Sequence, residues 1–374
     1  MPDFKWPRPQ LLAGGACALA CPALLQAADA VIVGQSITLQ DGKNAHGVAV
    51  LAGVKLALDT AARAGGPRIA LRTLDDQNKP ELAEANARQL VKDGALLLFG
   101  SVEGGPSGAV MKVAVETGTP FIGPMAGSPG LRRPRQPLVF PVRAEHREEF
   151  RALIGYGRRT GLKTVALLHA DSGTGREHLE NVRLLAGEAG MGFGGGQAFK
   201  SDVTDAQLDA IAAAFDRAGA DLVLNHGSAG VYERLIRRAR AAGLRTVYWG
   251  VNSGSTALAA ALGPLARGMV FAQIVPSPFA RKTALAREYQ ERWRAASPEQ
   301  PFSYSSLEGY ATARLLLAAL KAAGASPTRA SLLAALENFD LDLGGMSVHY
   351  RKGDHSGSRF VDLAMVGSDG RFIQ

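Results

Sequence analysis

The stretch ALLLFGSVEGGPSGAVMKVAVETGTPFIGPMAGSP, residues 95–129, decides the fold class of this chain. It predicts a buried strand ending in a Gly/Ser loop, then a helix, then a second strand ending in another loop of small residues. Neither loop carries an obvious nucleophile, metal ligand or phosphate-binding signature. Both offer backbone N–H groups at strand ends, one of them at a helix N-terminus, where anions bind. The stretch therefore favours a protein that holds a small polar ligand over one that transforms it.

Short β-branched runs alternate with helical patterns along the rest of the chain. Continuous apolar strands separated by helices indicate parallel sheets covered on both faces. Four predicted strands precede Phe140 and four follow it, which predicts two similar doubly wound α/β lobes. Such sheets bind ligands beyond the C-terminal ends of their strands, so two facing lobes would enclose a cleft. The strands are Val31–Gly34, Arg68–Leu74, Ala95–Ser101, Pro120–Pro124, Thr164–His169, Asp221–His226, Thr246–Val251 and Gly268–Gln273.

Helical patterns and the C-terminal region complete this prediction. From Met346 onward the chain predicts three more short strands, and residues 192–196 are interpreted as a Gly-rich turn. The helices are Gly47–Ala64, Pro80–Lys92, Ser107–Glu116, Arg147–Thr160, Arg176–Ala189, Asp205–Ala218, Gly230–Ala242, Ser277–Ala295, Ser305–Ala323 and Thr328–Leu336.

Residues 1–28 have the pattern of a secretory signal peptide. Lys5 and Arg8 form a positive head, Leu11–Leu25 is mostly apolar, and Leu25-Gln26-Ala27 offers a small-residue cleavage site. The apolar run falls short of the roughly 20 residues that a membrane helix needs. No later stretch comes close, so we expect an exported protein without an integral membrane span. A buried N-terminal helix is the alternative.

Both cysteines, Cys17 and Cys21, lie inside this segment. A chain cut after Ala27 or Ala28 contains no cysteine, which excludes disulfides and thiol catalysis. The sequence Ala18-Leu19-Ala20-Cys21 weakly resembles a lipoprotein cleavage box. Lipid attachment at Cys21 is the less favoured fate, because leucine is absent three residues before the cysteine.

The chain is basic, with 42 Lys and Arg residues against 34 Asp and Glu residues and a net charge of +8. The basic residues are scattered, apart from clusters at Arg132-Arg133-Arg135 and Arg234–Arg240. Few aromatic residues accompany them, and export conflicts with a nucleic-acid partner. A solvated basic surface is the interpretation that we favour, and we expect no nucleic-acid binding.

Enzymatic and metal motifs are weak. Asp171-Ser172-Gly173-Thr174 resembles the aspartic-protease motif, but that chemistry needs two carboxylates and no second copy exists. No Walker loop and no Gly-x-Ser-x-Gly elbow is present. The seven histidines include no i,i+4 pair with a glutamate between, and none has a cysteine partner. We therefore expect no enzyme, no metal and no cofactor.

An ordered series of short pieces runs through the chain. It comprises Val31-Ile32-Val33-Gly34, Gly53-Val54-Lys55-Leu56-Ala57, Leu74-Asp75-Asp76-Gln77, Gln89-Leu90-Val91, Phe99-Gly100-Ser101, Pro120-Phe121-Ile122-Gly123-Pro124, Val139-Phe140-Pro141-Val142-Arg143, Val165-Ala166-Leu167-Leu168, Leu235 to Gly243, Gly268-Met269-Val270 and the late helix around Tyr310. No single piece is specific, but the series resembles the periplasmic solute-binding proteins of the branched-chain amino-acid type. These are two-lobed proteins of the type 1 periplasmic-binding fold, which close on a ligand and deliver it to a membrane transporter.

The resemblance implies a periplasmic monomer that captures an amino acid or small carboxylate for the permease of an ABC-type transporter. It also implies three chain crossings between the lobes, near Arg143, Gln273 and Met346. The implied first lobe comprises residues 29–142 and 274–345, and the second comprises 143–273 and 346–374. Two alternatives remain: a ligand sensor of the same fold, and a secreted α/β hydrolase using His46, His226 and Asp171.

In this family, backbone N–H groups and hydroxyls of two first-lobe loops hold the ligand carboxylate. The glycines would allow close approach, and Pro106 would pre-set the start of a helix whose N–H groups favour an anion. The alternative is that these glycines only make tight strand–helix turns. The matching positions are Ser101, Gly104, Gly105 and Ser107 in one loop and Ala126, Gly127 and Ser128 in the other.

Other positions depart from the family pattern. The carboxylate that pairs with the ligand ammonium is replaced by Asn252, which carries no charge. Aromatic wall positions fall at His46, Thr174 and Ser228, and Tyr304 is a further candidate wall. These departures imply a more polar or larger ligand that still bears a carboxylate. Asp41 or Asp171 could replace the missing charge, so an amino acid remains open.

Overall fold

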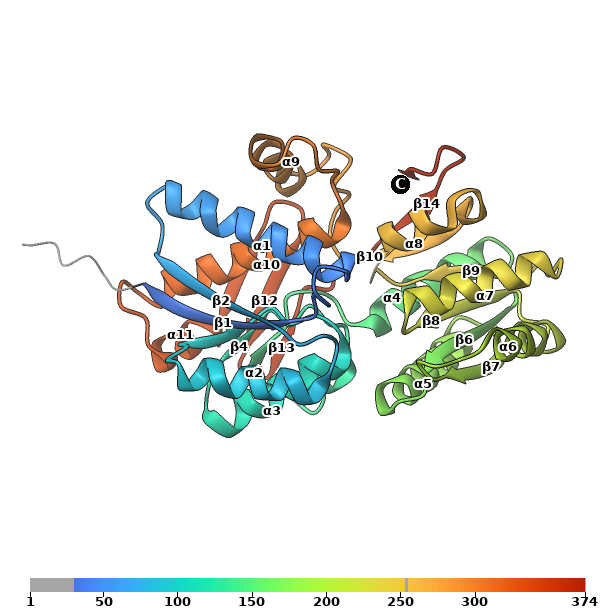
Figure 1. The fold of residues 1–374 in the computed structure, drawn as a ribbon, viewed down its shortest axis with the longest axis horizontal. Coiled ribbons are helices and arrows are strands. Elements are labelled where there is room, and N and C mark those ends of the chain that lie inside the picture. Colours follow the sequence, from blue (N-terminus) through green and yellow to red (C-terminus); the bar gives the residue numbers. More distant parts are fainter. Residues whose placement is uncertain (1–29, 253–254, 374) are drawn as a thin grey trace, which may run out of the picture.

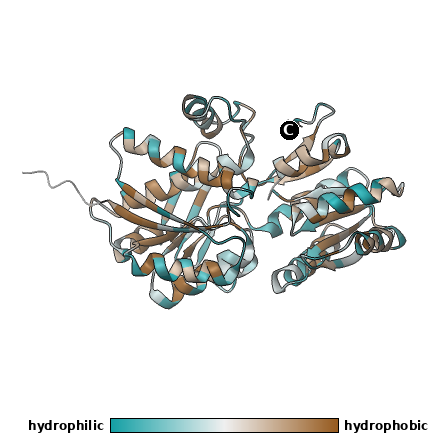
Figure 2. Ribbon diagram, in the orientation of Figure 1, coloured by the Kyte–Doolittle hydropathy of each residue, from teal (hydrophilic) through white to brown (hydrophobic). Residues whose placement is uncertain are grey.

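The computed structural model describes residues 30–252 and 255–373, and the predicted signal peptide with Cys17 and Cys21 lies outside the described residues. The described chain forms two lobes, each built on a mainly parallel sheet (Figure 1). Strands and the inner sides of the helices are apolar, whereas the outer helix faces are hydrophilic (Figure 2). The predicted two-lobed α/β fold is confirmed.

The first sheet has the order β2-β1-β3-β4-β5, with all neighbours parallel. Two separate apolar clusters flank it: α1 and α10 contribute to one, and α2 and α3 contribute to the other. The strands are β1 (Val31–Ile37), β2 (Ile69–Asp75), β3 (Leu97–Phe99), β4 (Phe121–Ile122) and β5 (Val139–Phe140). The helices of this lobe are α1 (Ala45–Arg63), α2 (Pro80–Lys92), α3 (Gly104–Thr117), α9 (Ala284–Ala296), α10 (Tyr304–Ala322) and α11 (Arg329–Leu336).

The second sheet has the order β15-β14-β10-β9-β8-β6-β7. Its strands from β10 to β7 are parallel, whereas β14 pairs antiparallel with β10. The strands are β6 (Thr164–Ala170), β7 (Gly192–Phe199), β8 (Leu222–His226), β9 (Val247–Gly250), β10 (Val270–Gln273), β14 (Asp362–Val366) and β15 (Phe372–Ile373). The helices are α4 (His146–Arg159), α5 (Gly173–Glu188), α6 (Asp205–Arg217), α7 (Ala229–Ala241) and α8 (Ser255–Leu262).

The third crossing between the lobes lies later than the sequence predicted. Strands β11 (Phe339–Asp342), β12 (Ser347–Arg351) and β13 (Asp354–Gly357) form a separate antiparallel sheet against the first lobe. The Tyr350 hydroxyl donates to the Pro141 carbonyl at 3.0 Å, and its ring meets the edge of Phe140. The backbone N–H of Ser358 donates to the Val142 carbonyl at 2.9 Å. The chain therefore crosses after residue 357, beside the first crossing, and the predicted crossing near Met346 is corrected.

Strand β7 corrects a second prediction, because residues 192–196 belong to a strand rather than a turn. A Cβ on Gly196 would lie 2.2 Å from the Cδ1 atom of Leu179 in α5. Gly195 has a φ of +85° where the pairing with β6 shifts register. The glycines therefore let α5 pack directly on an edge strand and accommodate a bulge.

Two helices also differ from the sequence prediction. The helix predicted over Ser277–Ala295 begins only at Ala284, where Thr283 caps it by accepting from the Ala286 N–H. Helix α8 follows β9 and was not predicted, because its Ala-rich sequence is short.

By length and composition alone, helix α1 could cross a membrane. This corrects the expectation that no stretch after residue 28 approaches the length and apolar character of a membrane helix. In the fold, α1 packs along α10 (Figure 1). A Cβ on Gly53 would lie 1.8 Å from the Ser306 carbonyl oxygen, and one on Gly309 would lie 2.1 Å from the Val50 oxygen. These two glycines let the helix backbones approach closely, which explains the apolar face of α1 by packing within the lobe.

We predict that Gly53→Ala destabilises the protein by about 1–3 kcal/mol, because backbone atoms of α10 leave no room for a Cβ. Gly187→Ala is the matched control, since no atom lies within 4 Å of its Cβ position in α5. That control is expected to be neutral or to stabilise by about 0.5–1 kcal/mol. Urea unfolding midpoints measure both changes, and equal midpoints for the two variants would contradict the close packing.

Candidate functional site

A cavity lies between the lobes, at the C-terminal ends of strands from both sheets. The volume between its lining atoms, including space open to solvent, is about 630 Å³. The first lobe contributes His46, Glu103, Gly104, Met125 and Ala126. The second contributes His146, Asn225, His226, Gly227, Ala229, Tyr232, Gly250, Val251, Leu258 and Phe271.

Helix α3 begins in the wall of this cavity. Gly104 and Gly105 occupy its first positions, where backbone N–H groups have no acceptor inside the helix. Glu103, directly before them, has a φ of +63°, a value that costs a non-glycine residue on the order of 1–3 kcal/mol. Burial and the charge of Asp76 raise the pKa of Glu103. The strained turn places a carboxyl group beside the positive end of α3.

Some of the predicted first-lobe residues line the cavity, and others are buried behind those that do. His46, Gly104 and Ala126 line the cavity. Ser101 and Ser107 are buried behind it, with their hydroxyl oxygens 2.7 Å apart. These two hydroxyls therefore fix the loop that carries the helix start.

Gly105, Gly127 and Ser128 also lie in these two loops without lining the cavity. A Cβ on Gly127 would lie 2.6 Å from the Cγ atom of His146, and one on Gly104 would lie 2.6 Å from the Ser128 hydroxyl. The two predicted loops therefore contact each other, and the second also contacts the start of α4.

The other predicted residues lie outside the cavity lining. The Ser228 hydroxyl caps α7 by accepting from the Val231 N–H at 3.3 Å, and Thr174 lies in the first turn of α5. Tyr304 is fully buried and packs edge-on against Phe279. Asn252, by contrast, forms hydrogen bonds with two carboxyl groups.

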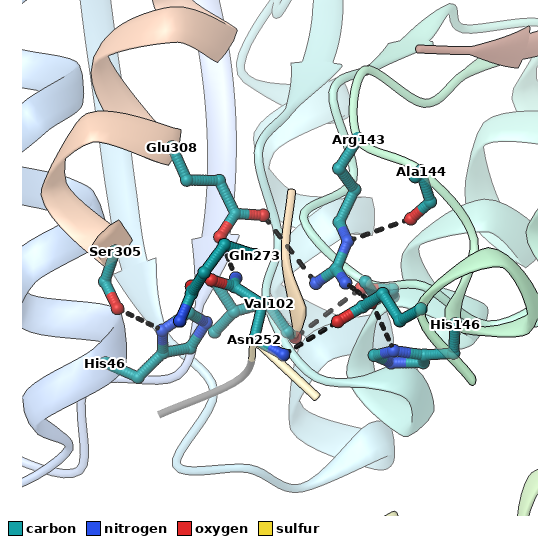
Figure 3. Close-up of polar contacts among 12 residues, drawn as sticks. His46, Val102, Arg143, Ala144, His146, Asn252, Gln273, Ser305 and Glu308 are labelled. Carbon is teal, nitrogen blue, oxygen red and sulfur yellow. Dashed lines mark hydrogen bonds and ion pairs between the residues drawn. The ribbon is translucent and has the colours of Figure 1, made fainter. Parts of the chain in front are cut away.

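Asn252 joins a buried polar network that the sequence did not predict (Figure 3). Its backbone N–H donates to Glu149 Oε2 at 2.7 Å, and its side-chain Nδ2 donates to Glu308 Oε2 at 3.1 Å. Arg143 forms an ion pair with Glu149, and its Nη1 atom lies 3.8 Å from Glu308 Oε1. The network connects the first crossing with α4, the end of β9 and helix α10.

Glu308 places an acidic group next to Asn252. Burial raises the pKa of Glu308 to about 7, against the opposing effect of the Arg143 guanidinium. Burial alone would also raise the pKa of Glu149, but Arg143 and His146 bring it below its ordinary value. Glu149 is therefore the ionised partner of Arg143, while Glu308 titrates near neutral pH.

Among the described residues, the contact between His46 and Ser305 is the one that most resembles the Ser–His pair of a hydrolase. The His46 Nδ1 atom lies 2.9 Å from the Ser305 hydroxyl oxygen (Figure 3). Burial, reinforced by the charge of Arg143, lowers the pKa of His46 to about 4. A base with such a pKa is poorly matched to proton abstraction near pH 7. The contact positions α10 against the start of α1 rather than activating the serine.

Three histidines from different elements meet beside the cavity. His146 starts α4, His178 lies in α5 and His226 ends β8, and one ring nitrogen of each lies within 4.8 Å of the others. Burial lowers the pKa of all three, so they are neutral at pH 7. Their sequence spacing carries no motif, and only the fold shows that these imidazoles could hold a metal.

Comparison with known proteins agrees with this architecture. A family model described as periplasmic binding protein matches residues 33–371, so the chain belongs to the periplasmic binding protein family. This family implies an extracytoplasmic location and consists of non-enzymatic solute-binding proteins. No curated protein sequence gives a significant match.

Solved structures with the type 1 periplasmic-binding fold are similar along nearly the whole chain. A substrate-binding periplasmic protein from Ralstonia solanacearum is 25% identical, with a TM-score of 0.83 over 92% of this chain and 99% of that one. A possible leucine/isoleucine/valine-binding protein from Rhodopirellula baltica is 26% identical, with a TM-score of 0.83 over 93% and 97%. An ABC-transporter solute-binding protein from R. palustris, solved with benzoate, is 21% identical, with a TM-score of 0.79 over 92% and 95%.

We predict that Glu308→Gln changes how stability depends on pH. The folded-state pKa of about 7 lies above the ordinary glutamate pKa of 4.5, so ionisation costs stability as pH rises between these values. Relative to the wild type, the variant should be more stable at pH 8 by on the order of 2–3 kcal/mol. The difference should vanish near pH 4.

Urea unfolding of both proteins from pH 4 to pH 8 measures this difference. Glu291→Gln, on the exposed face of α9, is the control and should show no comparable change with pH. A constant difference between Glu308→Gln and the wild type at every pH would refute the raised pKa.

Proposed function

We propose that this protein is the extracytoplasmic solute-binding component of an ABC-type transporter, which captures a small carboxylate, in particular an amino acid. The observation that carries the proposal is the interlobe cavity lined by strand-end loops of both sheets. A ligand that contacts both lobes stabilises their closed arrangement, and a permease can recognise that form. The similar proteins from Rhodopirellula baltica and R. palustris support a small-ligand role.

The proposed lobes follow the sheets. The first comprises residues 30–142 and 274–357, and the second comprises 143–252, 255–273 and 358–373. The polar network around Arg143 lies at the crossings between them (Figure 3). We propose that this region is the hinge and that the protein acts as a monomer.

The ligand chemistry follows from the start of α3. The first backbone N–H groups of α3, beginning at Gly104 in the cavity wall, provide a partial positive charge for a carboxylate. The Glu103 carboxyl group lies beside them in the cavity wall and can accept a hydrogen bond from an ammonium group. This pair of opposite charges matches the two ends of an amino acid, so Glu103 replaces Asp41 and Asp171 as the proposed acidic partner.

Binding without chemical transformation is the other part of the proposal. The described cavity lining offers the His46 imidazole, but its pKa of about 4 makes it a poor base. Asp171 is exposed and lies outside that lining. The three residues of the hydrolase alternative therefore do not assemble into a catalytic group.

Thermal unfolding against amino acids, benzoate and small carboxylates tests the function. A ligand at about a hundred times its dissociation constant should stabilise the protein by about 2.7 kcal/mol. If no member of the panel raises the melting temperature, the proposed ligand class is wrong.

Glu103→Gln then tests the ammonium partner. We expect this variant to bind amino acids on the order of 10–100-fold more weakly, because the negative charge that strengthens the hydrogen bond from the ammonium group is lost. Carboxylates without an ammonium group should bind with unchanged or higher affinity. Glu116→Gln, at the far end of α3, is the matched control and should not affect either ligand. Unchanged amino-acid affinity in Glu103→Gln would exclude the proposed contact.

A further inference from the structure

The buried side chain of His178 has no role in the polar network around Arg143. It is fully buried, and neither ring nitrogen has a hydrogen-bond partner among the described residues. Buried polar groups without a partner are rare and costly, and an unseen ion is one recognised explanation. His178 lies against two other imidazoles, with ring centroids 4.0 Å from His226 and 5.2 Å from His146. The orphaned nitrogens therefore face further nitrogen donors.

Glu149 orients one of these donors. The His146 Nδ1 atom lies 2.8 Å from Glu149 Oε1, and Arg143 forms an ion pair with that carboxylate. An ionised carboxylate only accepts hydrogen bonds, so His146 Nδ1 must carry the proton and Nε2 keeps its lone pair. Carboxylates that fix histidine tautomers in this way are typical outer-shell partners of metal ligands.

We propose that His146, His178 and His226 bind a divalent transition-metal ion at the edge of the interlobe cavity. The inference concerns the metal alone and does not depend on the proposed solute. Three imidazole nitrogens suit Zn²⁺, and equally Ni²⁺, Cu²⁺ or Co²⁺, better than Mg²⁺ or Ca²⁺, which prefer oxygen ligands.

The geometry needs only a small adjustment to hold the ion. Zn–N bonds of about 2.0–2.1 Å in a tetrahedral site place nitrogen atoms about 3.3 Å apart. The three donor atoms lie within 4.8 Å of one another, so each pair must approach by at most about 1.5 Å. His226 lies at a strand end and is the least buried of the three histidines.

The remaining coordination position faces the cavity. His146 and His226 both line it, whereas His178 lies behind them. Zinc sites with three protein ligands and one open position bind water or another molecule there, unlike closed structural sites. A solute carboxylate could therefore reach the ion directly from the cavity.

Isothermal titration with ZnCl₂, after EDTA treatment of the chain purified without a histidine tag, tests the site. We expect one ion per chain at this site and binding at least about a hundredfold weaker in His178→Phe. Because the imidazole nitrogens of His178 have no partner, metal-free His178→Phe should melt at the wild-type temperature or higher. During titration with CoCl₂, we expect the visible spectrum of bound Co²⁺ to show nitrogen coordination in the wild type and not in His178→Phe.

Two further variants make the result decisive. His226→Ala should also lose the site, and it provides an independent measurement if His178→Phe does not fold. His349→Phe changes an exposed histidine of β12 and should leave zinc affinity unchanged. If the wild type binds no Zn²⁺, or if both His178→Phe and His226→Ala keep wild-type affinity, the proposal is overturned.

Discussion

The buried guanidinium of Arg143 is the charge on which the arrangement of the two lobes depends. It lies at the first crossing, is 1% exposed, and is compensated by Glu149 at the start of the second lobe. Removing one partner of such a buried pair costs on the order of 3–5 kcal/mol, so the pairing constrains both sides of the crossing. Asn252 and Glu308 extend the same network to β9 and α10. The lobes are thus joined through matched polar groups as well as through apolar contacts such as that of Tyr304 with Phe372.

Much of the fold could be predicted from the sequence, because it depends on local patterns. Apolar runs such as Ala95–Ser101 and their alternation with helical patterns are sufficient to predict two parallel sheets. The third crossing was predicted too early because β12 alternates buried and exposed residues, a pattern that fits either lobe. Long-range contacts, such as those of Tyr350 with Phe140 and Pro141, show which lobe it joins.

The candidate site was less predictable, since it depends on side-chain directions and long-range contacts. His46, Gly104 and Ala126 line the cavity, but the Ser228 hydroxyl caps a helix and Tyr304 points into the core. Glu149 and Asn252 are 103 residues apart in sequence, so no local pattern could indicate their hydrogen bond. The three clustered histidines lie on α4, α5 and β8, and a search for a compact ligand motif could not find them.

The chain order of the sheets has a consequence for biogenesis. The first lobe's core needs α10, and the second sheet places β14, from the last residues of the chain, between β10 and β15. No N-terminal fragment therefore contains a complete lobe, and closing each core requires contacts of very large sequence separation, which slow folding. A partly synthesised or partly translocated chain would expose unfinished sheets in both halves. The second sheet can become complete only once β14 and β15 are available.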